Sequence, residues 1–214
     1  MPFYEKYGLV GLFLIIIPTT SLKAQKKDIP EDMKARHILT VESWRKNKDV
    51  DYRDKDNTML TKDLLKGFKG LNYYDIDYSY VVEGTLIIAA EHEKITIKTS
   101  TGDTYQNIIY GKVEFSLHGR KLQLNLYQSL NAAKEGRKKK ALFLPFTDLT
   151  SGEDTYGGGR YIGLTIPPDE EIIIDFNKAY NPYCAYNEKF SCPLVPWENH
   201  VELEIKAGVQ KFDH

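Results

Sequence analysis

The chain has 214 residues, with 29 basic and 30 acidic side chains and a formal net charge of −1. A chain of this length can bury one substantial core. The balanced charge argues against a nucleic-acid partner, because such proteins need a net basic face to displace counterions from phosphates. The one basic cluster, Lys134–Lys140 (KEGRKKK), is interpreted as a solvated hairpin tip.

The amino terminus has the pattern of a secretory signal. Lys6 precedes the ten-residue apolar run Gly8–Ile17, and small polar residues then lead to Ala24-Gln25. At about 1.5 Å per residue the run covers roughly half of a bilayer core of about 30 Å, so we expect no stable membrane span after cleavage. The pattern predicts an exported protein, periplasmic or extracellular, whose signal is residues 1–24, with an uncleaved anchor as the alternative.

Two helices are expected next. Asp28 with Pro30 and Glu31 is typical of a helix start. A helical stripe then follows, formed by Met33, His37, Val41 and Trp44, and a second short helix is expected over residues 60–68. Residues 25–56 are therefore predicted to form an N-terminal helical segment.

From Tyr78 onward the apolar period changes to two, which is the pattern of half-buried strands. The run Ile172–Phe176 is apolar on both sides and is expected to lie deep in the protein. We predict an all-β fold over residues 57–214, a mostly antiparallel barrel or barrel-like sandwich with the N-terminal helix packed on it. The alternating runs lie within 78–82, 95–97, 113–117, 122–126, 162–166 and 201–205.

Cys184 and Cys192 are the two cysteines of the chain. Nearby thiols of an exported protein tend to pair under oxidising conditions, so we expect a disulfide, with two reduced structural thiols as the alternative. The chain contains no C-x-x-C motif and its histidines are scattered, so neither a metal site nor a cofactor is expected.

Several dense motifs make the chain resemble domain of unknown function 1684, a family found in bacterial proteins. The resemblance covers nearly all of the chain after the signal, and it implies no particular activity, cofactor or partner. The motifs that carry it are FKGLNYY (68–74), LFLPFTDLTSGEDTYGGGRY (142–161), DFNKAYNPYCAY (175–186) and CPLVPWEN (192–199).

The first candidate site is Arg160 with Tyr161, directly after three glycines. Arginine presents a planar fork of donors suited to a carboxylate or phosphate, and glycine lets the backbone approach a ligand or another strand closely. The alternative is an internal ion pair of Arg160 with Asp148, Asp154 or Asp175.

The second candidate lies in DFNKAYNPYCAY. Asn177 and Asn181 can donate and accept hydrogen bonds, and Tyr183 offers a flat amphipathic face. Such residues suit a sugar or another small polar ligand, although asparagines also hold long loops through bonds to the backbone.

We therefore expect both segments to meet and form a pocket for a small polar or anionic ligand. Its predicted residues are Tyr156, Arg160, Tyr161, Asn177, Asn181 and Tyr183. Two alternatives remain open. The first is a small hydrolase in which Asp148 or Asp175 acts with Arg160, and the second is a non-catalytic scaffold or interaction protein.

Overall fold

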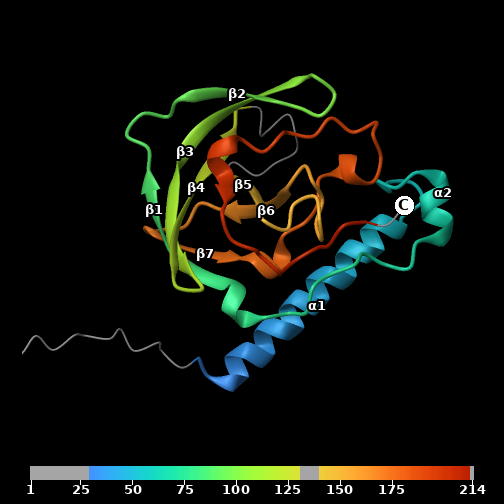
Figure 1. The fold of residues 1–214 in the computed structure, drawn as a ribbon, viewed down its shortest axis with the longest axis horizontal. Helices are drawn as coiled ribbons and strands as arrows, with labels where there is room; N and C mark the ends of the chain where they lie inside the picture. Colours follow the sequence, from blue (N-terminus) through green and yellow to red (C-terminus); the bar gives the residue numbers. More distant parts are fainter. Residues whose placement is uncertain (1–28, 131–139, 213–214) are drawn as a thin grey trace, which may run out of the picture.

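The computed structural model describes residues 29–130 and 140–212. Its main element is a curled, mostly antiparallel sheet in the strand order β6-β5-β4-β3-β1-β7, with β2 paired to β3 and β8 paired to β5 (Figure 1). This half-barrel, with a helix packed on it, confirms the predicted fold class. The strands are β1 (Val81–Ile88), β2 (Lys94–Lys98), β3 (Thr104–Leu117), β4 (Arg120–Ser129), β5 (Ala141–Asp148), β6 (Arg160–Thr165), β7 (Glu171–Asp175) and β8 (His200–Val201).

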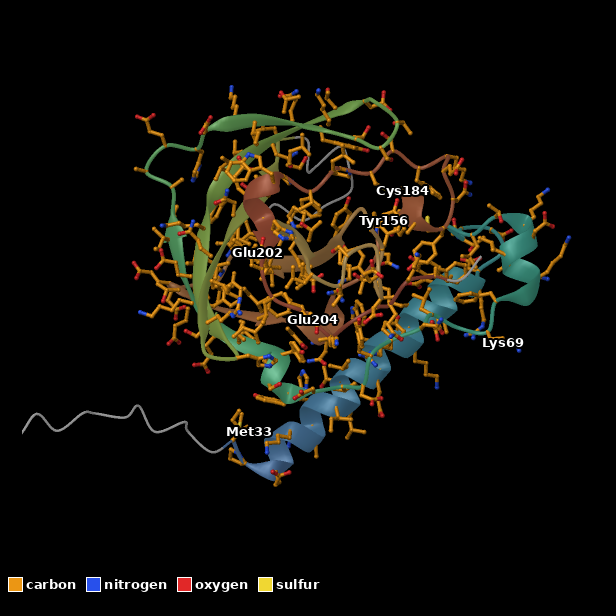
Figure 2. The ribbon with its side chains drawn as sticks, viewed as in Figure 1. Met33, Lys69, Tyr156, Cys184, Glu202 and Glu204 are labelled. Carbon is orange, nitrogen blue, oxygen red and sulfur yellow. The ribbon has the colours of Figure 1, made fainter. Side chains whose placement is uncertain are left out.

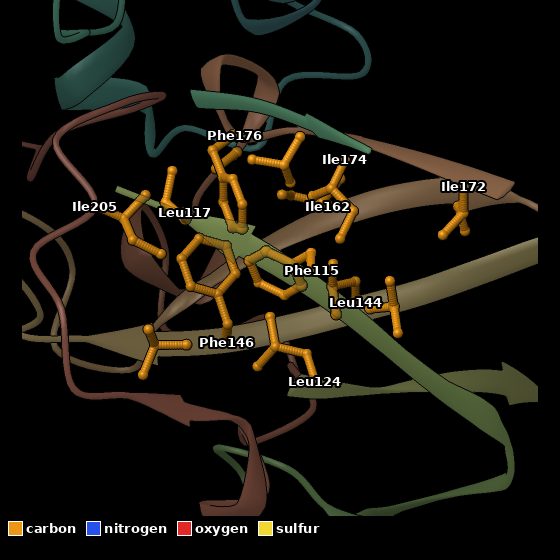
Figure 3. Packing of buried hydrophobic residues seen from close by; sticks show 14 of the residues in the cluster. Phe115, Leu117, Leu124, Leu144, Phe146, Ile162, Ile172, Ile174, Phe176 and Ile205 are labelled. Atoms are coloured by element: carbon orange, nitrogen blue, oxygen red, sulfur yellow. The ribbon is translucent and has the colours of Figure 1, made fainter. Parts of the chain in front are cut away.

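Side chains on the inner face of the curled sheet fill its interior. The rings of Phe115, Phe146 and Phe176 meet at the centre, with Phe176 lying 5.8 Å from Phe115 and 5.4 Å from Phe146 between centroids (Figure 3). All three belong to one buried cluster that also includes apolar residues from β1, β4, β6 and β7. The interior is therefore a packed core.

Strand β3 is long and bends, so it pairs with two neighbouring strands in turn. Its first half pairs with β2 and its second half with β1, and the register to β4 shifts between Ile109 and Gly111. A Cβ atom at Gly111 would lie 2.4 Å from the carbonyl oxygen of Ile87 on β1. Glycine is needed here because the neighbouring backbone approaches too closely for any side chain.

A buried asparagine side chain connects β4 and β5. The two strands pair at Tyr127–Phe143, and an antiparallel ladder continued by two residues would place Asn125 opposite Pro145. The amide of Asn199 lies there instead: its Oδ1 accepts from Asn125 N (2.9 Å), and its Nδ2 donates to Asn125 O (3.0 Å) and Pro145 O (2.7 Å). Proline has no N–H to donate, and the amide of Asn199 supplies the missing donor.

Two α-helices precede the sheet, as expected. Helix α1 (Glu31–Arg53) runs diagonally along one side of the molecule, and α2 (Lys62–Gly67) follows it, with the Thr61 hydroxyl accepting from Leu64 N (Figure 1). Val41, on the predicted stripe, is fully buried, whereas Met33 at the start of that stripe is half exposed. The predicted start at Asp28 and the signal region lie outside the described residues, as do residues 134–139 of the basic cluster. Among the described residues, none of the helices has the length and apolar character needed to cross a membrane.

Three local predictions were wrong. Tyr78–Tyr80 forms a 3-10 turn, in which the Asp77 side chain accepts from Ser79 N, and the strand begins only at Val81. On β7 the run Ile172–Phe176 is not buried on both sides, because Ile173 points outward between the buried Ile172 and Ile174 and is 61% exposed.

The last predicted strand, residues 201–205, has regular pairing only over His200–Val201. Farther along, side chains replace the ladder, because Asp148 accepts from Ile205 N at 2.6 Å and Arg160 donates to Ile205 O at 2.9 Å.

Candidate functional site

The two motif segments expected to form the site do meet. The backbones of Tyr161 on β6 and Tyr180 form an antiparallel bridge, with N–H···O distances of 2.8 and 3.0 Å in the two directions. Their rings pack edge to face with centroids 6.0 Å apart. The segment after β7 is therefore hydrogen-bonded to the free edge of β6.

Arg160, however, lies in the interior. Its side chain has no exposed surface, and its Nη2 lies 3.3 Å from Oδ2 of the equally buried Asp148. The guanidinium also donates to the carbonyl oxygens of Ala207 (2.5 Å), Ile205 (2.9 Å) and Val209 (3.4 Å). Burial lowers the pKa of Arg160, and the negative charge of Asp148 opposes this shift. Of the three candidate acids, Asp148 is the ion-pair partner, and the pair holds the C-terminal segment in place.

The glycine before Arg160 is explained by the neighbouring strand. Gly159 has φ +85°, and a Cβ atom there would lie 2.6 Å from the carbonyl oxygen of Phe146 on β5. The close approach is thus to another strand, which was one of the two possibilities open from the sequence.

The two predicted asparagines are also fully buried. Asn177 bonds to the backbone of Asp77 through both its side-chain oxygen (3.0 Å) and its side-chain nitrogen (2.9 Å), and its nitrogen also donates to Asp175 Oδ1 (3.0 Å). Asn181 donates to Gln210 O at 3.1 Å. The structure therefore corrects the expected pocket: Arg160, Asn177 and Asn181 are fully buried, and they bond to backbone groups and carboxylates of the protein itself.

The other predicted residues lie nearer the surface. Tyr161 and Tyr183 line a cavity of about 670 Å³ on the outer face of the sheet, which we call the tyrosine pocket. The hydroxyl of Tyr156 lies 3.8 Å from the Cys184 sulfur, and Figure 2 shows both side chains in the same region. The aromatic lining of the pocket consists of Tyr105, Tyr127, Phe143, Tyr161, Tyr180, Tyr183 and Phe190.

Strand alternation explains the floor of this pocket. On β4, Leu124 and Leu126 point into the core, so Tyr127 points outward, and Phe143 on β5 lies outward in the same way. The rings of Phe143 and Tyr161 pack edge to face at 4.7 Å between centroids. The floor is therefore made of aromatic residues that belong to a second cluster, outside the barrel core.

The wall opposite this floor comes from residues 182–193, which are attached to the sheet by hydrogen bonds. The Tyr161 hydroxyl donates to Pro193 O, and Leu194 N donates to Lys98 O at 2.8 Å. Burial raises the pKa of Tyr161, and it raises that of Tyr127 to about 12, so both phenols stay neutral in ordinary buffers. Within the described part of the chain, Lys189 is the one charged residue of the lining, and its ammonium lies 5.0 Å from the centroid of Phe190.

Several aromatic and charged residues of the lining were not predicted from the sequence: Tyr105, Tyr127, Phe143, Lys189 and Phe190. Tyr127 and Phe143 are large outward residues in strands whose alternate positions already fill the core, and this pattern was the available signal.

Cys184 and Cys192 lie beside each other as free thiols in the structure. Cys184 N donates to Cys192 Sγ at 3.1 Å. The pKa of the Cys184 thiol is lowered to about 6, mainly because the Cys192 thiol donates a hydrogen bond to it. Cys192 lines the tyrosine pocket. Across the described ranges, no group of three or more His, Cys, Asp or Glu side chains could hold a metal ion.

These features define a curled half-barrel protein with a packed interior and an aromatic pocket on its outer face. Residues 66–210 match the family described as "Protein of unknown function (DUF1684)". The chain belongs to this family.

Among solved structures, the chain is similar to the solution NMR structure of the uncharacterized protein from gene locus rrnAC0354 of Haloarcula marismortui. The two are 31% identical, the match covers 85% of this chain and 97% of that one, and the TM-score is 0.66. No curated protein matches the chain.

Proposed function

We propose that this protein binds a small ligand in the tyrosine pocket, and that the ligand combines a flat ring with an anionic group. The observation that carries the proposal is the lining itself: among the described residues, seven aromatic side chains surround a cavity of about 670 Å³, and Lys189 is the one charged side chain there. Pockets for small molecules typically measure about 300–1,000 Å³ and combine apolar walls with a few polar groups.

The lining chemistry supports this ligand class. Aromatic faces pack well against an aromatic ring or the apolar face of a sugar. Within the described residues no carboxylate pairs with Lys189, so its ammonium is free to meet a carboxylate or phosphate. The anionic ligand predicted from the sequence thus stays part of the proposal, with a flat ring added, and Lys189 replaces Arg160 as the cation that would meet it.

Truncating the exposed wall of the pocket is expected to weaken binding without unfolding the protein. Tyr183 is 40% exposed, so Tyr183→Ala removes a ring face at little cost to the core. We expect about 2- to 10-fold weaker binding of naphthalene-2-sulfonate by isothermal titration calorimetry, as follows from the usual worth of an aromatic contact. Lys189→Gln should weaken binding of this anion but leave binding of uncharged naphthalene nearly unchanged.

Trp197→Ala and Lys121→Gln are the matched controls, since both side chains are exposed and lie off the lining of the pocket. The proposal fails if naphthalene-2-sulfonate does not bind, or if the control variants weaken it as much as the pocket variants. Amide shifts in NMR spectra must also map to residues 180–193 upon binding.

The hydrolase alternative has little support from the geometry. Asp148 and Arg160 are both fully buried and hold backbone groups of the C-terminal segment, so a substrate has no access to them. Asp175 is mostly buried as well, and its carboxylate already accepts from His37 and Asn177.

We further propose that the chain is exported and that Cys184 pairs with Cys192 in its oxidising compartment. The apolar run near the amino terminus supports export, and the contact between the two cysteines supports pairing. Protein isolated from its native compartment should begin at Gln25 and gain the mass of two hydrogen atoms upon reduction. An unchanged mass and two alkylatable thiols in unreduced protein would refute the pairing.

A further inference from the structure

A second cavity of about 490 Å³ lies between α1 and the two edge strands of the sheet, β6 and β7. We call it the helix pocket; its walls include Trp44 and Lys48 from α1, Ile162 from β6 and Asp175 from β7. β6 and β7 end the strand order on opposite sides and do not pair with each other. The helix thus covers a gap in the half-barrel, and the cavity remains beneath it.

The ammonium of Lys48 is the unusual feature of this cavity. It lies 5.7 Å from the ring centroid of Trp44 and 5.5 Å from that of Tyr180, and the side chain is only partly exposed. Among the described residues, Lys48 has no carboxylate within salt-bridge distance. Contacts with aromatic faces favour a cation, yet a partly buried charge is stabilised most by an opposite charge.

Asp175, the acid on the wall, already has hydrogen-bond and ion-pair partners within the protein. Its Oδ2 lies 2.9 Å from His37 Nε2 and 3.2 Å from Lys178 Nζ, and its Oδ1 accepts from Asn177. Burial by itself would raise the pKa of Asp175, but the hydrogen bonds from His37 and Asn177 and the charge of Lys178 outweigh burial and lower it. The carboxylate is therefore ionised and internally paired, which leaves Lys48 as the excess charge of the cavity.

From this arrangement we infer that the helix pocket is a second binding site, for a small anion that carries a planar ring. The anionic group, a carboxylate or a phosphate monoester, pairs with Lys48, and the ring packs on Trp44, Tyr180 and the apolar side chains of the outer strands. The two cavities share Gly163, Leu164 and Tyr180 as a common wall but have different cations, Lys48 here and Lys189 in the tyrosine pocket. The inference therefore does not depend on the function proposed above.

The chain has two tryptophans, so Trp197→Phe leaves Trp44 in the wall of the helix pocket as the single reporter. In this background, phenyl phosphate should change the Trp44 emission saturably, and inorganic phosphate should bind more weakly. Lys48→Gln should weaken the binding of phenyl phosphate by about 2- to 5-fold. Lys48→Arg, which keeps the charge, should retain most of the affinity.

Lys46→Gln is the matched control, because Lys46 lies on the same helix but is exposed and does not line the cavity. Tyr183→Ala should leave the response of Trp44 unchanged, which separates this site from the tyrosine pocket. The inference is overturned if phenyl phosphate gives no saturable response in folded protein. It is also overturned if Lys46→Gln and Lys48→Gln weaken binding equally, or if Tyr183→Ala abolishes the response.

Discussion

Replacing Arg160 by alanine is expected to lower the free energy of unfolding by about 3–5 kcal/mol, because the change leaves Asp148 as a buried charge without its partner. Three backbone carbonyls, those of Ile205, Ala207 and Val209, lose their donor at the same time. All three of these residues are fully buried. Urea denaturation followed by circular dichroism measures the loss.

The same change should release the C-terminal segment before the sheet unfolds. Amide hydrogen exchange is expected to accelerate most at residues 205–209, which Arg160 and Asp148 attach to the sheet. Arg120→Ala is the control, because Arg120 is exposed and its side chain makes a single hydrogen bond, to Glu202 O. This change should lower the free energy of unfolding by less than about 1 kcal/mol. An Arg160→Ala protein as stable as this control would show that the buried pair contributes nothing.

The sequence predicted the sheet well because strand alternation is a local property. A side chain that points inward is apolar wherever its strand pairs, so Leu122, Leu124 and Leu126 could be recognised without knowing their neighbours. The prediction that Ile172–Phe176 is buried on both sides was wrong at Ile173, because strand alternation points it outward between the buried Ile172 and Ile174, and its outer face is left uncovered. Whether another element covers an outward apolar side chain is set by long-range packing, which no local pattern contains.

The polar motifs were harder to interpret for a related physical reason. Arg160 could pair with any of three acids, and only the pairing of β5 with β6 brings Asp148 within reach. The high content of Arg, Asn and Gly in these motifs indicated a conformationally restricted segment. In the protein, Asn177 and Arg160 hydrogen-bond to irregular backbone near the ends of strands. A polar side chain that replaces a ladder hydrogen bond cannot be told from a ligand-binding one by residue type.

Asn199 is the clearest example of a side chain that replaces hydrogen bonds of a strand ladder. Asn199→Ala is expected to lower the free energy of unfolding by about 3–5 kcal/mol. The side chain is fully buried and satisfies Asn125 N, Asn125 O and Pro145 O, so alanine leaves three backbone groups without partners. Each buried group that loses its partner costs about 1–3 kcal/mol, although such costs are not strictly additive. Pro145 cannot compensate, because it has no N–H with which to close the ladder.

Asn199→Asp separates the loss of donors from the loss of volume. The carboxylate still accepts from Asn125 N but cannot donate to the carbonyl oxygens of Asn125 and Pro145, and it places a negative charge against them. We therefore expect Asn199→Asp to be at least as destabilising as Asn199→Ala when both are measured by urea denaturation near pH 7. Asn187→Ala, at a partly exposed position where the side chain bonds only Lys189 N, is the control and should cost less than about 1 kcal/mol. If Asn199→Asp proved as stable as this control, the amide of Asn199 could not be replacing the missing N–H of Pro145 between β4 and β5.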